Sequence, residues 1–270
     1  MRSDLADLEG FYASRQGQLV RRLVLQRIRA AWPDLTGRRV LGLGYALPYL
    51  GGLGEAAERV IGLVPANAAT RRDGIAGGGR AALADEEALP LPDGAVDRVV
   101  LIHALEGCEQ VKPMLREVWR VLADGGRLLI VVPNRRGLWT LSDTTPFGVG
   151  RPYSQSQLDK TLRRALFEPL SFGRALYVPP VRSRLLLRTG VTWERVGSRW
   201  LPHFGGVLVA EAEKSIYAGT LAPEAETRRL PKYLPLPTRV AAARDRVAAR
   251  ERAAERDAVV YEFRPRPRAF

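Results

Sequence analysis

Residues 89–132 decide the fold of this chain, and they read LPLPDGAVDRVVLIHALEGCEQVKPMLREVWRVLADGGRLLIVV. Asp97 to Ile102 is an apolar run of strand length, and a second such run follows at residues 127–132. Between them, residues 111–122 repeat their apolar side chains with the period of a helix, and Asp124-Gly125-Gly126 forms a turn. Two continuous apolar strands joined by a helix predict neighbouring parallel strands that are buried on both faces.

The segments before this stretch continue the same alternation. Apolar runs predict strands at residues 39–43, 59–64 and 81–84, and residues 48–57 read as a turn followed by a helix. Residues 15–32 have the pattern of an amphipathic helix, which Pro33 and Gly37 end. The sequence therefore predicts an α/β domain with a mostly parallel sheet.

The segments after this stretch break the alternation. Residues 135–190 are rich in Gly and Pro, contain a helical stretch at 156–165, and read as a lobe inserted over the edge of the sheet. Residues 193–200 and 206–212 are predicted to close the sheet as a pair of strands. We expect one domain over residues 1–221 and a tail rich in Pro, Ala and Arg over residues 222–270, with a helix at 238–257.

Composition limits the classes of protein to which the chain can belong. It has 270 residues, 46% of them hydrophobic, which is enough for a sizeable core. No apolar run reaches 18 residues, which excludes a transmembrane helix, and the N-terminus lacks a signal sequence, so we expect a cytoplasmic protein without membrane partners. With Cys108 as the only cysteine and two histidines, no disulfide and no Cys/His zinc site are expected.

The formal net charge of +13 is concentrated in two regions. Residues 135–200 hold twelve basic and four acidic residues, and the tail, with twelve basic and seven acidic residues, holds the whole of the remaining excess. Such a basic lobe suits an anionic substrate or an RNA backbone, but a solvated arginine surface over an ordinary aromatic core explains it as well. Charge alone therefore leaves nucleic acid as the less favoured partner.

The sequence resembles the class I S-adenosylmethionine-dependent methyltransferases, particularly the type 11 group acting on small molecules. Residues 89–100 follow that family's pattern LP-hydrophobic-PDG-small-hydrophobic-D-x-V, and residues 115–128 follow its L-x-E-hydrophobic-x-R-V-L-x-x-G-G pattern. The resemblance spans about residues 38–134 and resumes at 204–214. It implies a Rossmann-like, mostly parallel seven-stranded sheet with helices on both faces, here with the inserted basic lobe, and S-adenosylmethionine as the cofactor.

The loop after the first predicted strand departs from the family pattern of an acid followed by Gly-x-Gly-x-Gly. Gly42 stands in place of the acid, Gly44 keeps the first glycine, and Ala46 and Pro48 replace the next two. Glycines at such positions let the backbone approach the cofactor closely, whereas proline removes an N–H donor. Tyr45 lies where it could fill the space of the missing groups.

The resemblance implies further cofactor contacts at the ends of the next strands. Val64 occupies the position of the acid that usually binds the ribose hydroxyls, and an aliphatic side chain cannot accept those bonds. Asp85, with Glu86 one residue away, aligns with the acid that usually binds the adenine amino group. His103 follows the fourth strand, where it would contact the cofactor or the substrate.

His103 and Glu106 are the candidate catalytic residues, because an imidazole at this position could act as a general base. Alternatively, His103 packs against the cofactor's base or caps the strand, and Glu106 is an acid at a helix start. Tyr12, just before the first predicted helix, belongs either to a lid over the cofactor or to ordinary packing.

The leading prediction is S-adenosylmethionine-dependent methyl transfer to a small or anionic acceptor, without a metal. The loss of usual residues at positions 42, 46, 48 and 64 favours an alternative, a binding protein that kept the fold and lost catalysis. Binding of RNA through the basic lobe and the tail is a third alternative. The sequence leaves the acceptor and the oligomeric state open.

Overall fold

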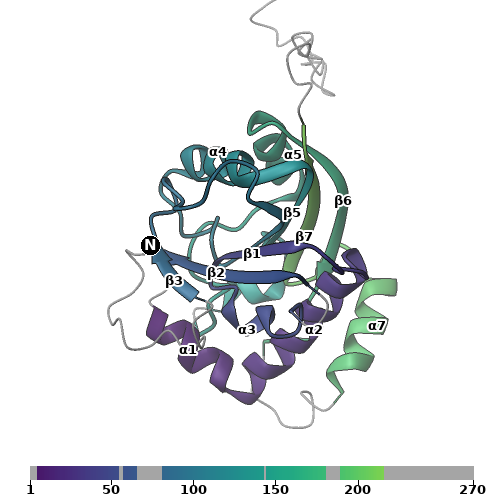
Figure 1. Cartoon of the computed structure of the whole chain (residues 1–270). Helices are drawn as coiled ribbons and strands as arrows, with labels where there is room; N and C mark the ends of the chain where they lie inside the picture. Colours follow the sequence, from purple (N-terminus) through teal and green to yellow (C-terminus); the bar gives the residue numbers. More distant parts are fainter. Residues whose placement is uncertain (1–4, 55–56, 66–80, 143, 181–188, 216–270) are drawn as a thin grey trace, which may run out of the picture. The chain divides into compact units, whose positions relative to one another are not determined.

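A single seven-stranded sheet organises the chain (Figure 1). The computed structural model describes residues 5–54, 57–65, 81–142, 144–180 and 189–215. The strand order is β3-β2-β1-β4-β5-β7-β6; β1 to β5 are parallel, and β7 runs antiparallel to both of its neighbours. The strands are β1 (Arg39–Gly44), β2 (Arg59–Pro65), β3 (Ala81–Ala84), β4 (Val96–Ile102), β5 (Leu122–Pro133), β6 (Phe167–Ala175) and β7 (Val207–Lys214). The predicted mostly parallel, seven-stranded α/β sheet is confirmed.

Helices cover both faces of the sheet. They are α1 (Leu5–Ala13), α2 (Arg15–Ala31), α3 (Leu47–Leu50), α4 (Val111–Val121), α5 (Gln155–Arg164) and α7 (Gly190–Trp200), with a 3₁₀ turn at Leu138–Leu141. Figure 1 shows α1, α2 and α3 on one face and α4 and α5 on the other. Successive residues of β4 alternate between two cores, because side chains of a strand point to opposite faces. Among the described helices, none is long and apolar enough to cross a membrane.

One predicted strand is a helix. Residues 193–200, expected as a closing strand beside residues 206–212, belong to α7. The strand that takes the expected place at the edge of the sheet, beside β7, is β6, which lies inside the predicted lobe. In α7, Glu194 and Gly197 are buried toward Tyr177, and a Cβ at Gly197 would lie 2.3 Å from the Tyr177 Cβ. β6 is an edge strand whose register shifts at Pro169, which is where a sheet tolerates a proline.

Two smaller predictions also need correction or stay open. Of the helical segment expected at residues 48–57, the described part (48–54 and 57) is helical only as α3, over residues 47–50. The helix predicted at 238–257 lies outside the described residues. An additional helix, α1, precedes the predicted amphipathic helix, which the structure contains as α2.

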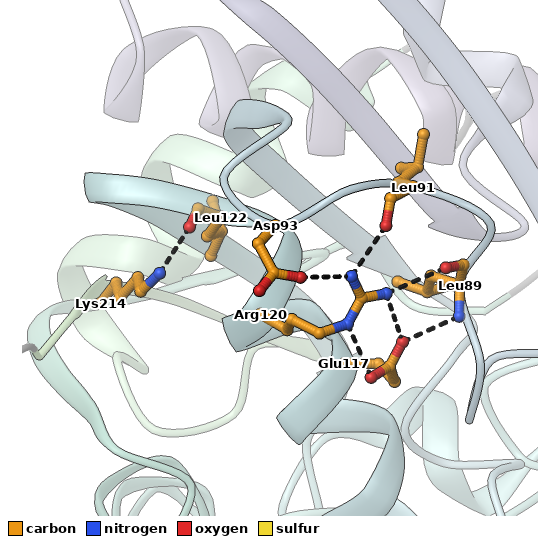
Figure 2. A network of polar contacts seen from close by, with 7 residues as sticks. All are labelled: Leu89, Leu91, Asp93, Glu117, Arg120, Leu122 and Lys214. Atoms are coloured by element: carbon orange, nitrogen blue, oxygen red, sulfur yellow. Dashed lines mark hydrogen bonds and ion pairs between the residues drawn. The ribbon is translucent and has the colours of Figure 1, made fainter.

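Arg120 of α4 holds the loop before β4 in place (Figure 2). Its guanidinium donates to the carbonyl oxygens of Leu89 (3.0 Å) and Leu91 (2.8 Å) and to the carboxylates of Asp93 (2.7 Å) and Glu117 (2.7 and 3.0 Å). A Glu117 oxygen also accepts the Leu89 N–H at 3.0 Å. The two sequence patterns that resemble the methyltransferases are therefore joined by one hydrogen-bonded network.

Two facing glycines let α3 lie directly on the sheet. Gly42 of β1 and Gly62 of β2 are partners in the parallel ladder. A Cβ at Gly42 would lie 2.8 Å from the Ala46 Cβ and from a methyl group of Leu50, and one at Gly62 would lie 2.4 Å from a methyl group of Leu47. The absence of an acid at position 42 thus has a packing reason: α3 occupies its space.

Candidate functional site

The candidate site lies at the carboxyl ends of β1 and β4, the edge at which open α/β sheets bind ligands. The Tyr45 N–H donates to the carbonyl oxygen of Ile102 at 2.7 Å, which draws the loop after β1 against the end of β4. Gly44 makes this approach with φ +83°, and a Cβ there would lie 2.4 Å from the same oxygen. Only glycine fits at this position.

A chain of four buried polar side chains occupies this edge. The Glu106 Oε1 and His103 Nδ1 atoms lie 3.0 Å apart, the His103 Nε2 and Tyr12 hydroxyl 2.9 Å apart, and the Tyr12 and Tyr49 hydroxyls 2.8 Å apart. All four side chains are at most 8% exposed. The structure therefore joins both candidate catalytic residues, and it links them to α1 and α3.

The hydrogen bonds among these four side chains can be assigned donors and acceptors in one consistent direction. Burial raises the pKa of Tyr12 and of Tyr49, so both phenols keep their protons at neutral pH. When Glu106 is a carboxylate, Nδ1 of His103 must carry the proton that is shared with it. In the neutral imidazole Nε2 then accepts from Tyr12, and Tyr12 accepts from Tyr49. The basic nitrogen of His103 faces Tyr12.

His103 adopts an unusual backbone conformation. Its φ is +51°, in the left-handed region that non-glycine residues rarely occupy. Such a conformation costs about 1–3 kcal/mol and persists where the surroundings fix it, often at functional sites. Here its hydrogen bonds to Glu106 and Tyr12 hold the imidazole at the strand end.

Aromatic rings enclose the polar chain. His103 and Phe147 have ring centroids 4.9 Å apart, Tyr12 and Tyr45 are separated by 5.4 Å, and Phe147 and Trp139 by 5.5 Å. Burial raises the pKa of Tyr45 to about 12. The aromatic cluster consists of Phe11, Tyr12, Tyr45, Tyr49, His103, Trp139 and Phe147, whose ring contacts connect them. It brings α1, the loop after β1 and the lobe together over the ends of β1 and β4.

The remaining predicted cofactor residues lie outside the polar chain. Gly42 and Ala46 pack beneath α3, and Val64, 1% exposed, belongs to the hydrophobic core. Asp85 is exposed and follows β3, and its Oδ1 accepts the Glu87 N–H at 2.9 Å, so it stabilises its own turn. Glu86 is buried beside it.

Four members of the aromatic cluster were not predicted as site residues: Phe11, Tyr49, Trp139 and Phe147. Tyr49 stands four residues after Tyr45, a spacing that places both on one side of a helical turn. Trp139 and Phe147 were expected only as aromatic residues of the basic lobe. No group of three His, Cys, Asp or Glu side chains that could hold a metal ion occurs in the part of the chain that is described.

Comparisons with known proteins show a family match in the centre of the chain and a shared fold over most of it. Residues 41–130 match the family model described as methyltransferase domain. A S-adenosylmethionine-dependent methyltransferase structure from Thermotoga maritima aligns with a TM-score of 0.56 and 18% identity, over 77% of this chain and 94% of its own. One from Archaeoglobus fulgidus gives 0.53 and 19%, over 76% and 97%.

A third similar structure is the Haloferax volcanii complex between the Trm112 methyltransferase activator and a methyltransferase, with a TM-score of 0.55 and 18% identity over 79% of this chain and 98% of that one. No curated protein sequence matches the chain. At these identities the structural similarity establishes the fold, and the family match covers its central strands and α4. Residues 41–130 therefore match the methyltransferase-domain family, and the chain has the fold of class I, S-adenosylmethionine-dependent methyltransferases.

Proposed function

We propose that this domain transfers a methyl group from S-adenosylmethionine to a small acceptor, and that His103 receives the proton which the acceptor loses. The observation that carries the proposal is the buried chain of Glu106, His103 and Tyr12 at the ends of β1 and β4. A histidine oriented by a carboxylate is the arrangement of a general base. Glu106 acts here as a positioning residue that fixes the imidazole tautomer.

The residues present fit the cofactor at its methionine end. Gly44 leaves no side chain between the loop after β1 and the end of β4, and Glu106 has a buried oxygen, Oε2, without a hydrogen-bond partner among the described residues. The ribose end fits less well, because Val64 cannot accept a hydrogen bond. When bound, S-adenosylmethionine supplies an electrophilic methyl group on a sulfonium sulfur.

The residues of this chain would position the acceptor and take its proton. Because the Tyr12 hydroxyl covers Nε2, the acceptor's proton passes to the Tyr12 oxygen while Tyr12 donates its own proton to Nε2. His103 then carries the charge beside Glu106, which stabilises the imidazolium. Positioning supplies most of the rate in such an in-line transfer.

The chemistry around the site supports a small acceptor. The aromatic cluster closes over the polar chain and buries His103, which favours a small acceptor over a macromolecule. Arg135 and Arg136 follow β5 at the same edge and are exposed, which favours an acceptor with an anionic group.

The second candidate is the non-catalytic binding protein. Its support is specific: α3 fills the space of an acid at position 42, and Val64 replaces the ribose ligand. In that case the aromatic cluster, Tyr12 included, is part of the hydrophobic core and never opens to a ligand, and the domain does not bind S-adenosylmethionine.

Calorimetric titration separates the two candidates. Micromolar binding of S-adenosylmethionine and S-adenosylhomocysteine is expected, and Gly44→Ala should weaken it by at least about tenfold because its Cβ meets the end of β4. Gly37→Ala is the matched control, since Gly37 also has a positive φ but faces open space. The absence of heat at millimolar ligand, with the protein folded, would establish the non-catalytic candidate.

A further inference from the structure

One oxygen of Glu106 has no role within the described structure. The side chain is 6% exposed, and Oε1 contacts His103 Nδ1 while Oε2 is buried with no hydrogen-bond partner among the described residues. A buried carboxylate oxygen without a partner is costly, so proteins rarely keep one without a reason. Among the described residues, His103 is the only basic side chain within ion-pair distance of Glu106.

The surroundings of Glu106 suit a cation. Its own backbone oxygen accepts the Arg151 N–H at 2.9 Å, and a Cβ at Gly150 would lie 2.6 Å from that oxygen. Residues 150 and 151 of the lobe therefore pack directly against the Glu106 backbone. Tyr12 and Tyr153 both lie close enough for the Glu106 charge to contribute, after burial, to raising the pKa of each phenol. A buried carboxylate oxygen that lacks a partner suits an ammonium group, because such a group supplies both the opposite charge and the hydrogen-bond donors.

The packing of α3 explains why the carboxylate that binds an ammonium group would lie in the segment after β4. The resemblance to the class I methyltransferases implies an acid at the position of Gly42, which usually holds the cofactor's amino group indirectly. Here Ala46 and Leu50 occupy the space that an acidic side chain would need. The strands β1 and β4 are neighbours and are paired up to Gly44 and Ile102. Glu106 follows Ile102 by four residues and so lies just beyond the end of β4, beside the loop after β1.

We propose that Glu106 replaces the missing acid, and that its Oε2 binds the ammonium group of the cofactor's methionine moiety. Glu106 then has two functions, one for each oxygen: it positions His103 and it anchors the cofactor. This inference rests on the proposed function, because it requires that the domain bind S-adenosylmethionine.

Binding of two ligands tests this assignment. S-adenosylhomocysteine carries the ammonium group, whereas 5′-methylthioadenosine shares the nucleoside and sulfur but lacks the amino-acid portion. Glu106→Gln should weaken S-adenosylhomocysteine by about 10- to 100-fold, the range for one charge-assisted hydrogen bond, and leave 5′-methylthioadenosine within about twofold. Glu106→Asp, which keeps the charge, should bind S-adenosylhomocysteine more tightly than Glu106→Gln.

Glu211→Gln is the matched control, because Glu211 is also a buried glutamate of the sheet but pairs with Trp32 and Arg127. Melting curves verify that each variant is folded. Equal affinity of wild type and Glu106→Gln for S-adenosylhomocysteine would overturn this inference and leave the proposed function intact. Failure of the wild type to bind either ligand would overturn the proposed function itself.

Discussion

The Tyr12 hydroxyl is the atom on which three separate segments of the chain meet. It lies within hydrogen-bond distance of Tyr49 in α3 and of His103 after β4, 37 and 91 residues away in the sequence. Its ring also contacts those of Phe11 and Tyr45. Tyr12 therefore connects α1 to the proposed proton acceptor.

We expect Tyr12→Phe to lower the free energy of unfolding by about 1–3 kcal/mol, because it leaves the buried Tyr49 hydroxyl and His103 Nε2 without their partner. Urea denaturation measures this loss. Tyr177→Phe, whose hydroxyl donates to Pro202 at an exposed site, should cost less than about 1 kcal/mol. Equal losses in the two variants would show that the Tyr12 hydrogen bonds do not stabilise the fold.

At the scale of elements, the interaction of α4 with the loop before β4 fixes the centre of the sheet. Arg120 joins the two segments through three hydrogen bonds to oxygens of the loop, and two further bonds to Glu117 of α4 hold its guanidinium in place (Figure 2). These residues, which carry the family resemblance, thereby fix the position of β4, at whose end His103 stands.

Arg120→Met should lower the free energy of unfolding by about 2–4 kcal/mol, since the Leu89 and Leu91 carbonyls and the Glu117 carboxylate all lose their bonds to the guanidinium. Arg163→Met removes an arginine that pairs with Asp159 and Glu168 on the surface, and we expect a loss below about 1 kcal/mol. Chemical denaturation of both variants gives the comparison. A change for Arg120→Met no larger than for Arg163→Met would refute the anchoring role.

For the whole molecule, charge decides how stability responds to acid. The formal net charge is +13 at pH 7, so protonation of carboxylates adds to an existing excess of positive charge. Hydrogen bonds from Arg39 lower the pKa of Asp97 from 3.8, and those from Arg120 lower the pKa of Glu117 from 4.5. Both groups stabilise the fold above their unfolded pKa values and lose that contribution as pH falls through the folded values.

Asp97→Asn should therefore reduce stability at pH 7, and its difference from wild type should shrink as pH falls below about 4. Urea unfolding from pH 7 to pH 3 measures this. Burial raises the pKa of Glu194, so the pH dependence of its contribution to stability has the opposite sign. The stability of the wild type should increase relative to that of Glu194→Gln as pH falls. A difference for Asp97→Asn that stays constant over this range would contradict the assignment.

Much of the fold could be predicted because its signals are local. The apolar runs of β1, β2, β3, β4 and β5 and the helical period of α4 lie within short stretches. The exceptions are β6, which contains a proline, and α7, whose Trp-rich sequence reads as a strand. Both depend on packing at the edge of the sheet, where Gly197 fits against Tyr177 and Pro169 meets a shift in register.

The sequence by itself determined the parallel core of the sheet, the position of His103 and Glu106 after β4, and the departures at Gly42 and Val64. These follow from residue types and spacings within a few turns of chain. Only the tertiary structure decided that Tyr12 and Tyr49 join His103, that α3 occupies the space of the absent acid, and that one Glu106 oxygen is left without a partner among the described residues. Contacts between segments up to 91 residues apart depend on how the helices pack on the sheet, which no local pattern records.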